Sequence, residues 1–171
     1  LQEALLGSEH PALRATWSTL SRIADELDDR EAAVLATRRA HAASLRVSGA
    51  QSPATVQQAI TLAGALAKVG LFDEAERLLE NAAQLPSPPL DLHLHLAQTR
   101  AFVLLMKRDL EAASKAAHVA VDLAIKARVQ RAHVEILLGV IEGERGEDVA
   151  ARALLERSLQ AYVELGYQHG H

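Results

Sequence analysis

The sequence predicts an all-α fold, an α-α superhelix built from about four helical hairpins in tandem. Three observations support this prediction. Apolar residues recur at helical spacing, start and stop signals for helices recur with them, and similar blocks of sequence return after about 40 residues. No segment shows the apolar and polar alternation of a strand on a sheet surface. We therefore expect about eight antiparallel helices in a right-handed superhelix.

Internal similarity divides the chain into four repeats. A step of 42 residues brings segment 10–13 onto segment 52–55, and two steps of 38 residues continue the pattern. Alanines fall at the same place in each repeat: Ala33, Ala75, Ala113 and Ala151. One hairpin cannot bury its apolar face alone, so neighbouring hairpins should stack. We expect one repeat domain over 1–171, a segment of a longer protein, with repeats at about 11–48, 53–86, 89–127 and 131–166.

The second repeat has the clearest helix signals. Its first helix is expected over 53–69, where apolar residues follow a three–four spacing. Ser52 can accept a hydrogen bond from an unpaired amide, and Pro53 has no N–H to leave unpaired at the first helical position. Gly70 ends the helix because glycine adopts the left-handed conformation without a Cβ clash.

Acidic residues mark the starts of the second helices. In the second repeat, Asp73 and Glu76 have the spacing of a capping box, and the proline-rich segment 86–89 stops the helix. Asp28 and Glu31 repeat the scheme in the first repeat. The third repeat is expected to have helices over about 89–106 and 110–126. The fourth should have them over about 131–145 and 147–165, with Gly166 after the last.

The first two repeats resemble a known family. Trp17, Leu20, Ala24, Ala33 and Ala40 resemble the signature of tetratricopeptide repeats, and the second repeat matches it more fully. The 42-residue step is similar to the long repeats of kinesin light chains and their bacterial relatives, and segment 153–166 is similar to repeats of large bacterial regulators. Arg outnumbers Lys 14 to 4, which with abundant Ala suggests a bacterial source. By this resemblance, Trp17 should pack inside its own hairpin.

Two residues depart from the family pattern. Arg100 stands where the third repeat should have a packing leucine, and Glu142 where the fourth should have an apolar residue in mid-helix. Either the alignment is shifted by one residue there, or these repeats deviate from the ideal geometry.

Composition excludes several functions. The chain has 171 residues, 49% of them hydrophobic but only 3% aromatic, so its core must be built from Ala, Leu, Val and Ile. It has no Cys, which excludes disulfides and thiolate metal sites. The net charge of −4 and the scattered Lys and Arg argue against a nucleic-acid partner. No apolar run approaches the roughly 20 residues that cross a bilayer, so we expect no membrane partner and a cytoplasmic location.

Catalytic and metal sites are not indicated. His93 and His95 are two residues apart and would point to different sides of a helix, and His169 and His171 lie at the chain end. No zinc-protease, phosphate-loop or nucleophile-elbow motif occurs. Segment 25–29 is acidic but lacks the spacing of a calcium loop. We therefore expect no metal, no cofactor and no enzymatic activity.

The family resemblance implies a site for a partner. In tetratricopeptide proteins the first helix of each repeat lines a concave groove. The positions that it nominates here are Arg22, Glu26, Gln57, Lys68, His95, Gln98, Phe102, Met106 and His133, with Ser18, Ile60, Gly64, Ile136 and Val140 beside them. Phe102 and Met106 are four residues apart on one helix face, as apolar anchors of a groove or as core residues would be.

Three functions compete at this point. The first is a scaffold that binds a protein, as a peptide or a partner helix, within a larger bacterial regulatory protein. The second is a structural spacer that forms homo-oligomers by stacking through open repeat ends, because Leu1, Leu5 and Leu6 resemble the end of a preceding helix. The third is an enzyme or a small-ligand sensor, for which the sequence has no residue constellation.

Overall fold

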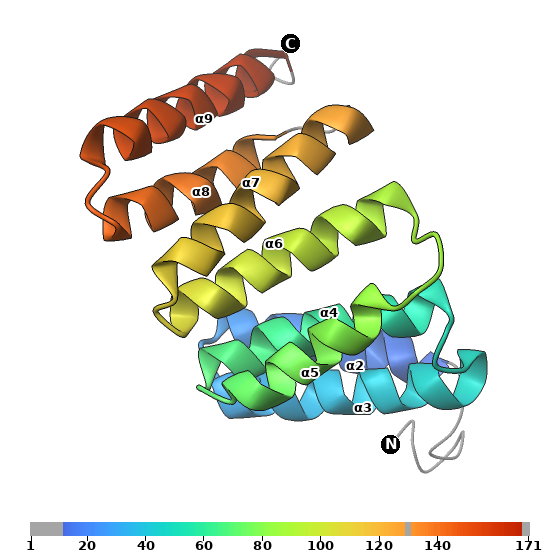
Figure 1. The fold of residues 1–171 in the computed structure, drawn as a ribbon. Coiled ribbons are helices and arrows are strands. Elements are labelled where there is room, and N and C mark those ends of the chain that lie inside the picture. The colour runs from blue at the N-terminus through green and yellow to red at the C-terminus, as the bar shows by residue number, and fades with distance from the viewer. Residues whose placement is uncertain (1–11, 129–130, 169–171) are drawn as a thin grey trace. The chain divides into compact units, whose positions relative to one another are not determined.

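The computed structural model describes residues 12–128 and 131–168, and this part of the chain contains eight helices and no strand (Figure 1). The helices follow one another in the order α2 (Ala12–Glu26), α3 (Arg30–Ser48), α4 (Pro53–Lys68), α5 (Phe72–Ala83), α6 (Leu90–Met106), α7 (Leu110–Ala127), α8 (Ala132–Glu144) and α9 (Asp148–Gln168). The expected all-α fold of consecutive hairpins is confirmed. None of these helices combines the length and the apolar character that a membrane-spanning segment needs.

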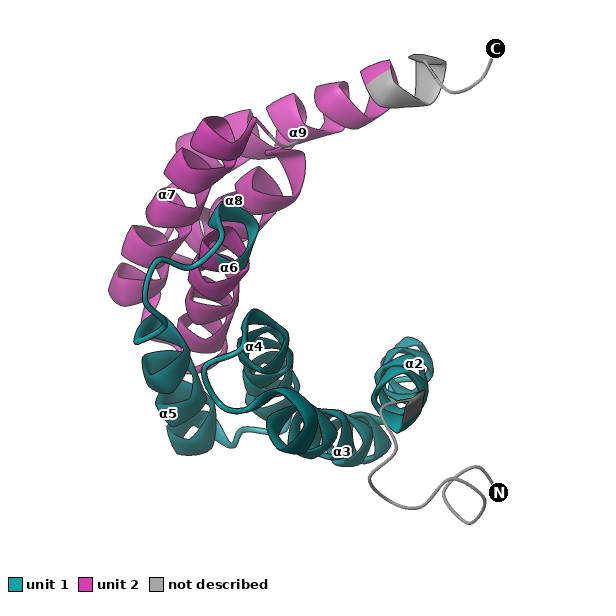
Figure 2. Cartoon of the chain, turned by 90° about the vertical axis from the view of Figure 1, so that its right-hand side faces the viewer, with its two compact units in different colours: residues 1–92 teal, residues 93–171 magenta. Residues whose placement is uncertain are grey.

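The chain divides into two compact units, which Figure 2 shows in two colours. The N-terminal unit covers residues 1–92 and contains the hairpins α2–α3 and α4–α5. The C-terminal unit covers residues 93–171 and contains most of α6 together with α7, α8 and α9. A single repeat domain over 1–171 and the handedness of its superhelix stay predictions.

The turn inside each hairpin has the same conformation. In every one, a residue with positive φ follows the first helix, and its amide and the next amide donate to carbonyls of the last helical turn, as in a Schellman motif. At Gly70, the Gly70 amide donates to the Ala67 carbonyl at 3.1 Å and the Leu71 amide to the Leu66 carbonyl at 3.0 Å. The residues with positive φ in these four turns are Asp28, Gly70, Arg108 and Gly146. Their spacing of 42, 38 and 38 residues reproduces the repeat found in the sequence.

Helix starts agree only in part with the expected caps. Ser52 accepts a hydrogen bond from the Thr55 amide at 3.1 Å, and Pro53 occupies the first turn of α4, as expected. The predicted cap at Asp28 is wrong by one residue. Asp29 accepts from the Ala32 amide at 3.0 Å, because Asp28 is taken up by the left-handed turn.

Two other boundaries were also predicted wrongly. Asp73 does not cap α5, because the helix already begins at Phe72 and its cap residue Leu71 makes no side-chain hydrogen bond. Gly166 does not end the last helix, since α9 continues to Gln168. Nothing after Gly166 in α9 is proline or a residue that needs a left-handed conformation, so the helix continues.

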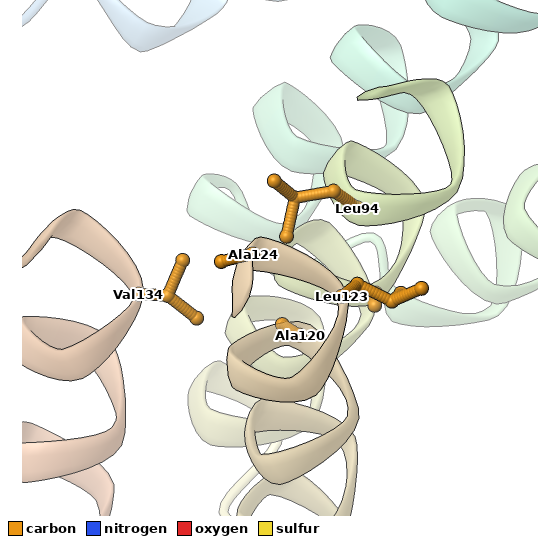
Figure 3. Packing of buried hydrophobic residues seen from close by; sticks show 6 residues of the cluster. Leu94, Ala120, Leu123, Ala124 and Val134 are labelled. Atoms are coloured by element: carbon orange, nitrogen blue, oxygen red, sulfur yellow. The ribbon is translucent and has the colours of Figure 1, made fainter. Parts of the chain in front are cut away.

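The core is built mainly from alanine and leucine. The four repeated alanines are buried, with Ala75 and Ala113 completely inaccessible. In the C-terminal unit, Leu94 of α6, Leu123 and Ala124 of α7 and Val134 of α8 belong to one buried cluster (Figure 3). Short side chains allow the helices to approach closely, and α7 thereby joins α6 to α8.

Two signature residues of the first repeat are partly accessible to solvent. Trp17 is half-buried, and Leu20 is 42% exposed although its counterpart Leu62 in the second repeat is buried. Leu20 lies on α2, the first helix that the structure describes, and no described helix precedes α2 to cover that side. Trp17 packs against its own hairpin as expected, but neither residue is fully covered.

The departures at Arg100 and Glu142 do not reflect a shifted alignment. The hairpin turns keep the register, so Glu142 occupies the interior position of Leu66, and it is buried. Its carboxylate accepts from Ser114 Oγ at 2.6 Å and from Arg145 Nη1 at 2.5 Å. Arg100 simply points to solvent. The fourth repeat thus replaces an apolar contact with a polar cluster.

Candidate functional site

In the N-terminal unit, all charged candidate residues form ion pairs within the chain. Arg22 and Glu26 form an exposed ion pair of 2.6 Å on α2. Lys68 Nζ lies 2.5 and 2.6 Å from the two carboxylate oxygens of Asp25, and thereby joins the end of α4 to the end of α2. Lys68 is therefore engaged in holding two helices together, which reduces its availability for a partner.

The other candidates of this unit are mostly covered. Ile60 is fully buried, so its nomination as a contact residue was wrong. Gln57 and Gly64 on the same helix are half-buried. Ser18 of α2 donates a hydrogen bond of 3.4 Å to Gln58 of α4. The candidate residues of the N-terminal unit are therefore charged or largely covered, although Leu20 and Ile23 of α2 are 42% and 41% exposed.

The candidate residues of the C-terminal unit include more apolar side chains. Met106 on α6 is 38% exposed, and Ile136 and Val140 on α8 are 36% and 44% exposed. Phe102 is half-buried between core and surface. The 38-residue step matches residues 95, 98 and 102 of α6 with residues 133, 136 and 140 of α8. We define the first-helix face of this unit as His95, Gln98, Phe102, Met106, His133, Ile136 and Val140.

Two of the residues in this face are histidines, His95 and His133. Burial lowers the pKa of the half-buried His95 below its ordinary value of 6.5. The ring of His133 meets that of Tyr162 edge to face, with centroids 5.8 Å apart, and Tyr162 Oη and His133 Nδ1 form a hydrogen bond. His133 is thus held by α9 at the edge of the face.

Metal ligands are not grouped in the described residues. In this part of the chain, which includes His93 and His95, no three His, Asp or Glu side chains gather as they would around an ion. His93 is exposed whereas His95 is half-buried, as expected for residues two apart on a helix. His169 and His171 lie outside the described residues.

Sequence reasoning missed a notch of about 630 Å³ between α7, α8 and α9. We call it the arginine notch and define it by its lining residues, Ala124, Ile125, Arg128, Arg131, Ala132, Glu135, Arg157, Gln160, Ala161 and Glu164. Glu135 is buried, and its carboxylate lies beside the guanidinium groups of Arg131 and Arg157. The available signal was Glu135 itself, a charged residue at a position where the second and third repeats have Ala59 and Ala97.

Comparison with known proteins supports the fold and not a particular family. No protein-family model matches the chain. No curated protein matches it in sequence. The crystal structure of BtubC (BKLC) from P. vanneervenii is similar, with a TM-score of 0.65 at 15% sequence identity. The similar region covers 92% of this chain and 66% of the BtubC chain, so the chain spans somewhat less than two thirds of that protein. This likeness places the chain among helical repeat folds.

Proposed function

We propose that the chain is a protein-interaction scaffold, and that a peptide or helix of its partner binds across the first-helix face of the C-terminal unit. The observation that carries this proposal is the row of exposed apolar side chains on α6 and α8. Met106, Ile136 and Val140 are each more than a third exposed on neighbouring first helices. We also propose, from the resemblance described above, a place in a larger bacterial regulatory protein of the cytoplasm.

The face has the composition of a recognition surface. Exposed apolar side chains that gather on one surface mark interaction sites more often than scattered ones do. A partner helix binds such a surface with apolar side chains three or four residues apart. Phe102 and Met106, and likewise Ile136 and Val140, have the same spacing on this chain. His95, Gln98 and His133 can supply the hydrogen bonds that orient the partner.

The fold supports a scaffold role. All described helices pack as hairpins around cores of alanine and larger aliphatic residues, and the chain resembles BtubC in this helical repeat fold. A stack of hairpins presents repeated helix faces to a partner without a dedicated catalytic pocket. The N-terminal candidates Arg22, Glu26, Gln57 and Lys68 remain part of the proposal as a secondary, charged surface.

Selection from a peptide library tests the proposal. The full chain would be immobilised and used to enrich peptides, and the enriched peptides would then be titrated into the ¹⁵N-labelled chain. We expect the largest amide shifts in α6 and α8, at residues of the first-helix face. Shifts confined to α7 and α9, or a selection that enriches no sequence, would show that this face is not a partner site.

A second candidate function is self-association through repeat ends. On α9, Leu155, Leu159 and Val163 are four residues apart and are 39%, 65% and 43% exposed. Terminal repeats normally present a polar outer face, so this apolar row favours stacking on a further repeat. Sedimentation of the chain over a range of concentrations tests this function. A monomer at all concentrations, unchanged by Leu159→Glu, would exclude it.

A further inference from the structure

We infer that the arginine notch binds an acidic segment of a protein, and that Arg128, Arg131 and Arg157 hold an oxyanion group of that segment. The oxyanion is a carboxylate or a phosphate, because both present the same geometry to a guanidinium group. The notch is formed by different residues from the first-helix face, so this inference does not rest on the function proposed for that face.

A buried carboxylate fixes two of the arginines. Glu135 is 1% exposed, and its Oε1 lies 3.2 Å from Arg131 Nε and 2.7 Å from Arg157 Nη2. Neither contact has hydrogen-bond geometry, and Oε1 has no hydrogen-bond partner. A guanidinium group has five N–H donors, so Arg131 and Arg157 each keep donors that Glu135 does not take. Both side chains are about half exposed at the notch, where those donors can meet a ligand.

The surroundings add positive potential. Arg128 has a left-handed backbone at the end of α7, and no carboxylate of the described residues pairs with its guanidinium group. The helix α8 starts directly after Arg131 without a side-chain cap, and the positive end of its dipole lies at Ala132, which lines the notch. The lining has three arginines against Glu135 and Glu164, and Glu164 accepts a hydrogen bond of 3.0 Å from Gln160.

The N-terminal unit provides an internal comparison. A notch of about 270 Å³ occurs there between α3, α4 and α5, at the same place in the repeat. The residues that correspond to Glu135, Arg157 and Gln160 are Ala59, Asn81 and Gln84, which also line their notch. The repeat geometry alone therefore produces the notch, and the fold does not require the charges. A buried ion pair is seldom more stabilising than apolar residues in its place, so the charged set calls for a different explanation.

The lining selects among anionic ligands. None of the described residues that line the notch is aromatic, so none of them offers a surface on which a nucleobase would stack. The chain has a net charge of −4, which disfavours a long polyanion. Ala124, Ile125 and Ala132 add apolar surface beside the guanidinium groups, and the volume lies within the usual range of ligand pockets. An acidic peptide segment fits these properties, with one oxyanion on the arginines and its chain on the apolar surface.

Three synthetic peptides test the inference. They have equal length, blocked ends and an alanine-rich sequence, and they carry glutamate, glutamine or phosphoserine at the same positions. Each is titrated into the ¹⁵N-labelled full chain, and the Nε–H signals of the arginines are followed. We expect the glutamate or the phosphoserine peptide to shift Arg128, Arg131 and Arg157, and the glutamine peptide to leave them unmoved. The tighter of the two acidic peptides identifies the oxyanion.

Two substitutions sharpen the test. Arg128→Gln leaves the contacts of Glu135 intact, so the chain should fold, yet binding of the acidic peptide should weaken by about tenfold. The matched control is Arg152→Gln, an exposed arginine on α9 that pairs with Glu156 outside the notch, and it should leave the affinity unchanged.

Three results would overturn the inference. They are equal binding of the glutamine peptide, equal affinity of wild type and Arg128→Gln, and no shift of these arginines with either acidic peptide at millimolar concentration. Because the peptides have no large apolar side chains, none of these results tests the first-helix face. A negative result for the first-helix face likewise does not test the notch.

Discussion

The guanidinium carbon of Arg39 lies 4.5 Å from the centre of the Trp17 ring. These two residues are equally far from the hairpin turn, one before it and one after it, and the same positions in the fourth repeat hold Glu135 and Arg157. The hairpin therefore brings this pair of positions together in both outer repeats, once as a cation–π contact and once as an ion pair. The inner repeats have only small or uncharged residues there: Ala59 with Asn81, and Ala97 with Val119.

The Trp17–Arg39 contact should make a modest contribution to stability. Because Trp17 is half-buried, Trp17→Ala should cost about 1–3 kcal/mol, less than the about 3–5 kcal/mol of a fully buried aromatic residue. A double-mutant cycle with Arg39→Gln, measured by urea denaturation, should give a coupling of about 0.5–1 kcal/mol. Strict additivity of the two substitutions would show that the contact contributes nothing.

The hairpin turns predict opposite effects for two substitutions. Arg108 has a φ of 68°, which costs free energy for a residue with a Cβ, so Arg108→Gly should stabilise the chain by up to about 1 kcal/mol. Its exposed ion pair with Glu144 contributes little and should not reverse the sign. Gly146→Ala, at the same place in the next turn with a φ of 84°, should destabilise by about 1 kcal/mol. Thermal melts of the two variants that shift in the same direction would contradict this account.

The turns also show how far the sequence could predict the fold. The repeat, the eight helices and the buried alanines follow from periodicity and were predicted closely. Gly70 was predicted as a turn residue because glycine favours a left-handed backbone. Asp28 and Arg108 adopt the same conformation, although residues with a Cβ do so much less often than glycine. The cap at Asp28 was misplaced for this reason.

The buried carboxylate of Glu142 should depend on its partners. Arg145→Ala leaves this carboxylate with Ser114 alone, so it should destabilise by about 2–3 kcal/mol. Replacing the polar pair by Glu142→Leu with Ser114→Ala restores the apolar type that Leu66 has at this position, and should be nearly neutral. Chemical denaturation of the three proteins checks the order. The account fails if the double variant is less stable than Arg145→Ala.

The candidate sites differ in how far the sequence revealed them. The first-helix face could be predicted from the repeat, because the 38-residue step makes residues 136 and 140 of α8 equivalent to residues 98 and 102 of α6. The repeat did not predict how deeply each residue of a first helix is buried, and Ile60 is a core residue. The arginine notch depends on the end of α7 and the start of α8 meeting the body of α9, so the sequence alone does not place Arg128 and Arg157 in one notch.

Stability should decrease in mild acid. Burial lowers the pKa of His41 and His95 below 6.5, so the unfolded chain binds more protons than the folded chain as the pH falls past that value. Their contribution is absent above about pH 7 and becomes destabilising as the pH falls through 6.5 toward the lowered pKa values. His41→Gln together with His95→Gln should flatten the dependence of the melting temperature between about pH 7.5 and 5.5. An unchanged slope in the double variant would refute this origin.

The most direct measurement compares the affinity of a selected peptide for two matched double variants. One is Met106→Ser with Val140→Ser on the first-helix face, and the other is Val119→Ser with Val149→Ser on α7 and α9. All four side chains are more than a third exposed, so both variants should keep the helical spectrum and melting temperature of the wild type. A partner that binds the first-helix face should lose about tenfold or more in affinity for the first variant and nothing for the second. Retained binding by the first variant together with loss in the second would contradict the account.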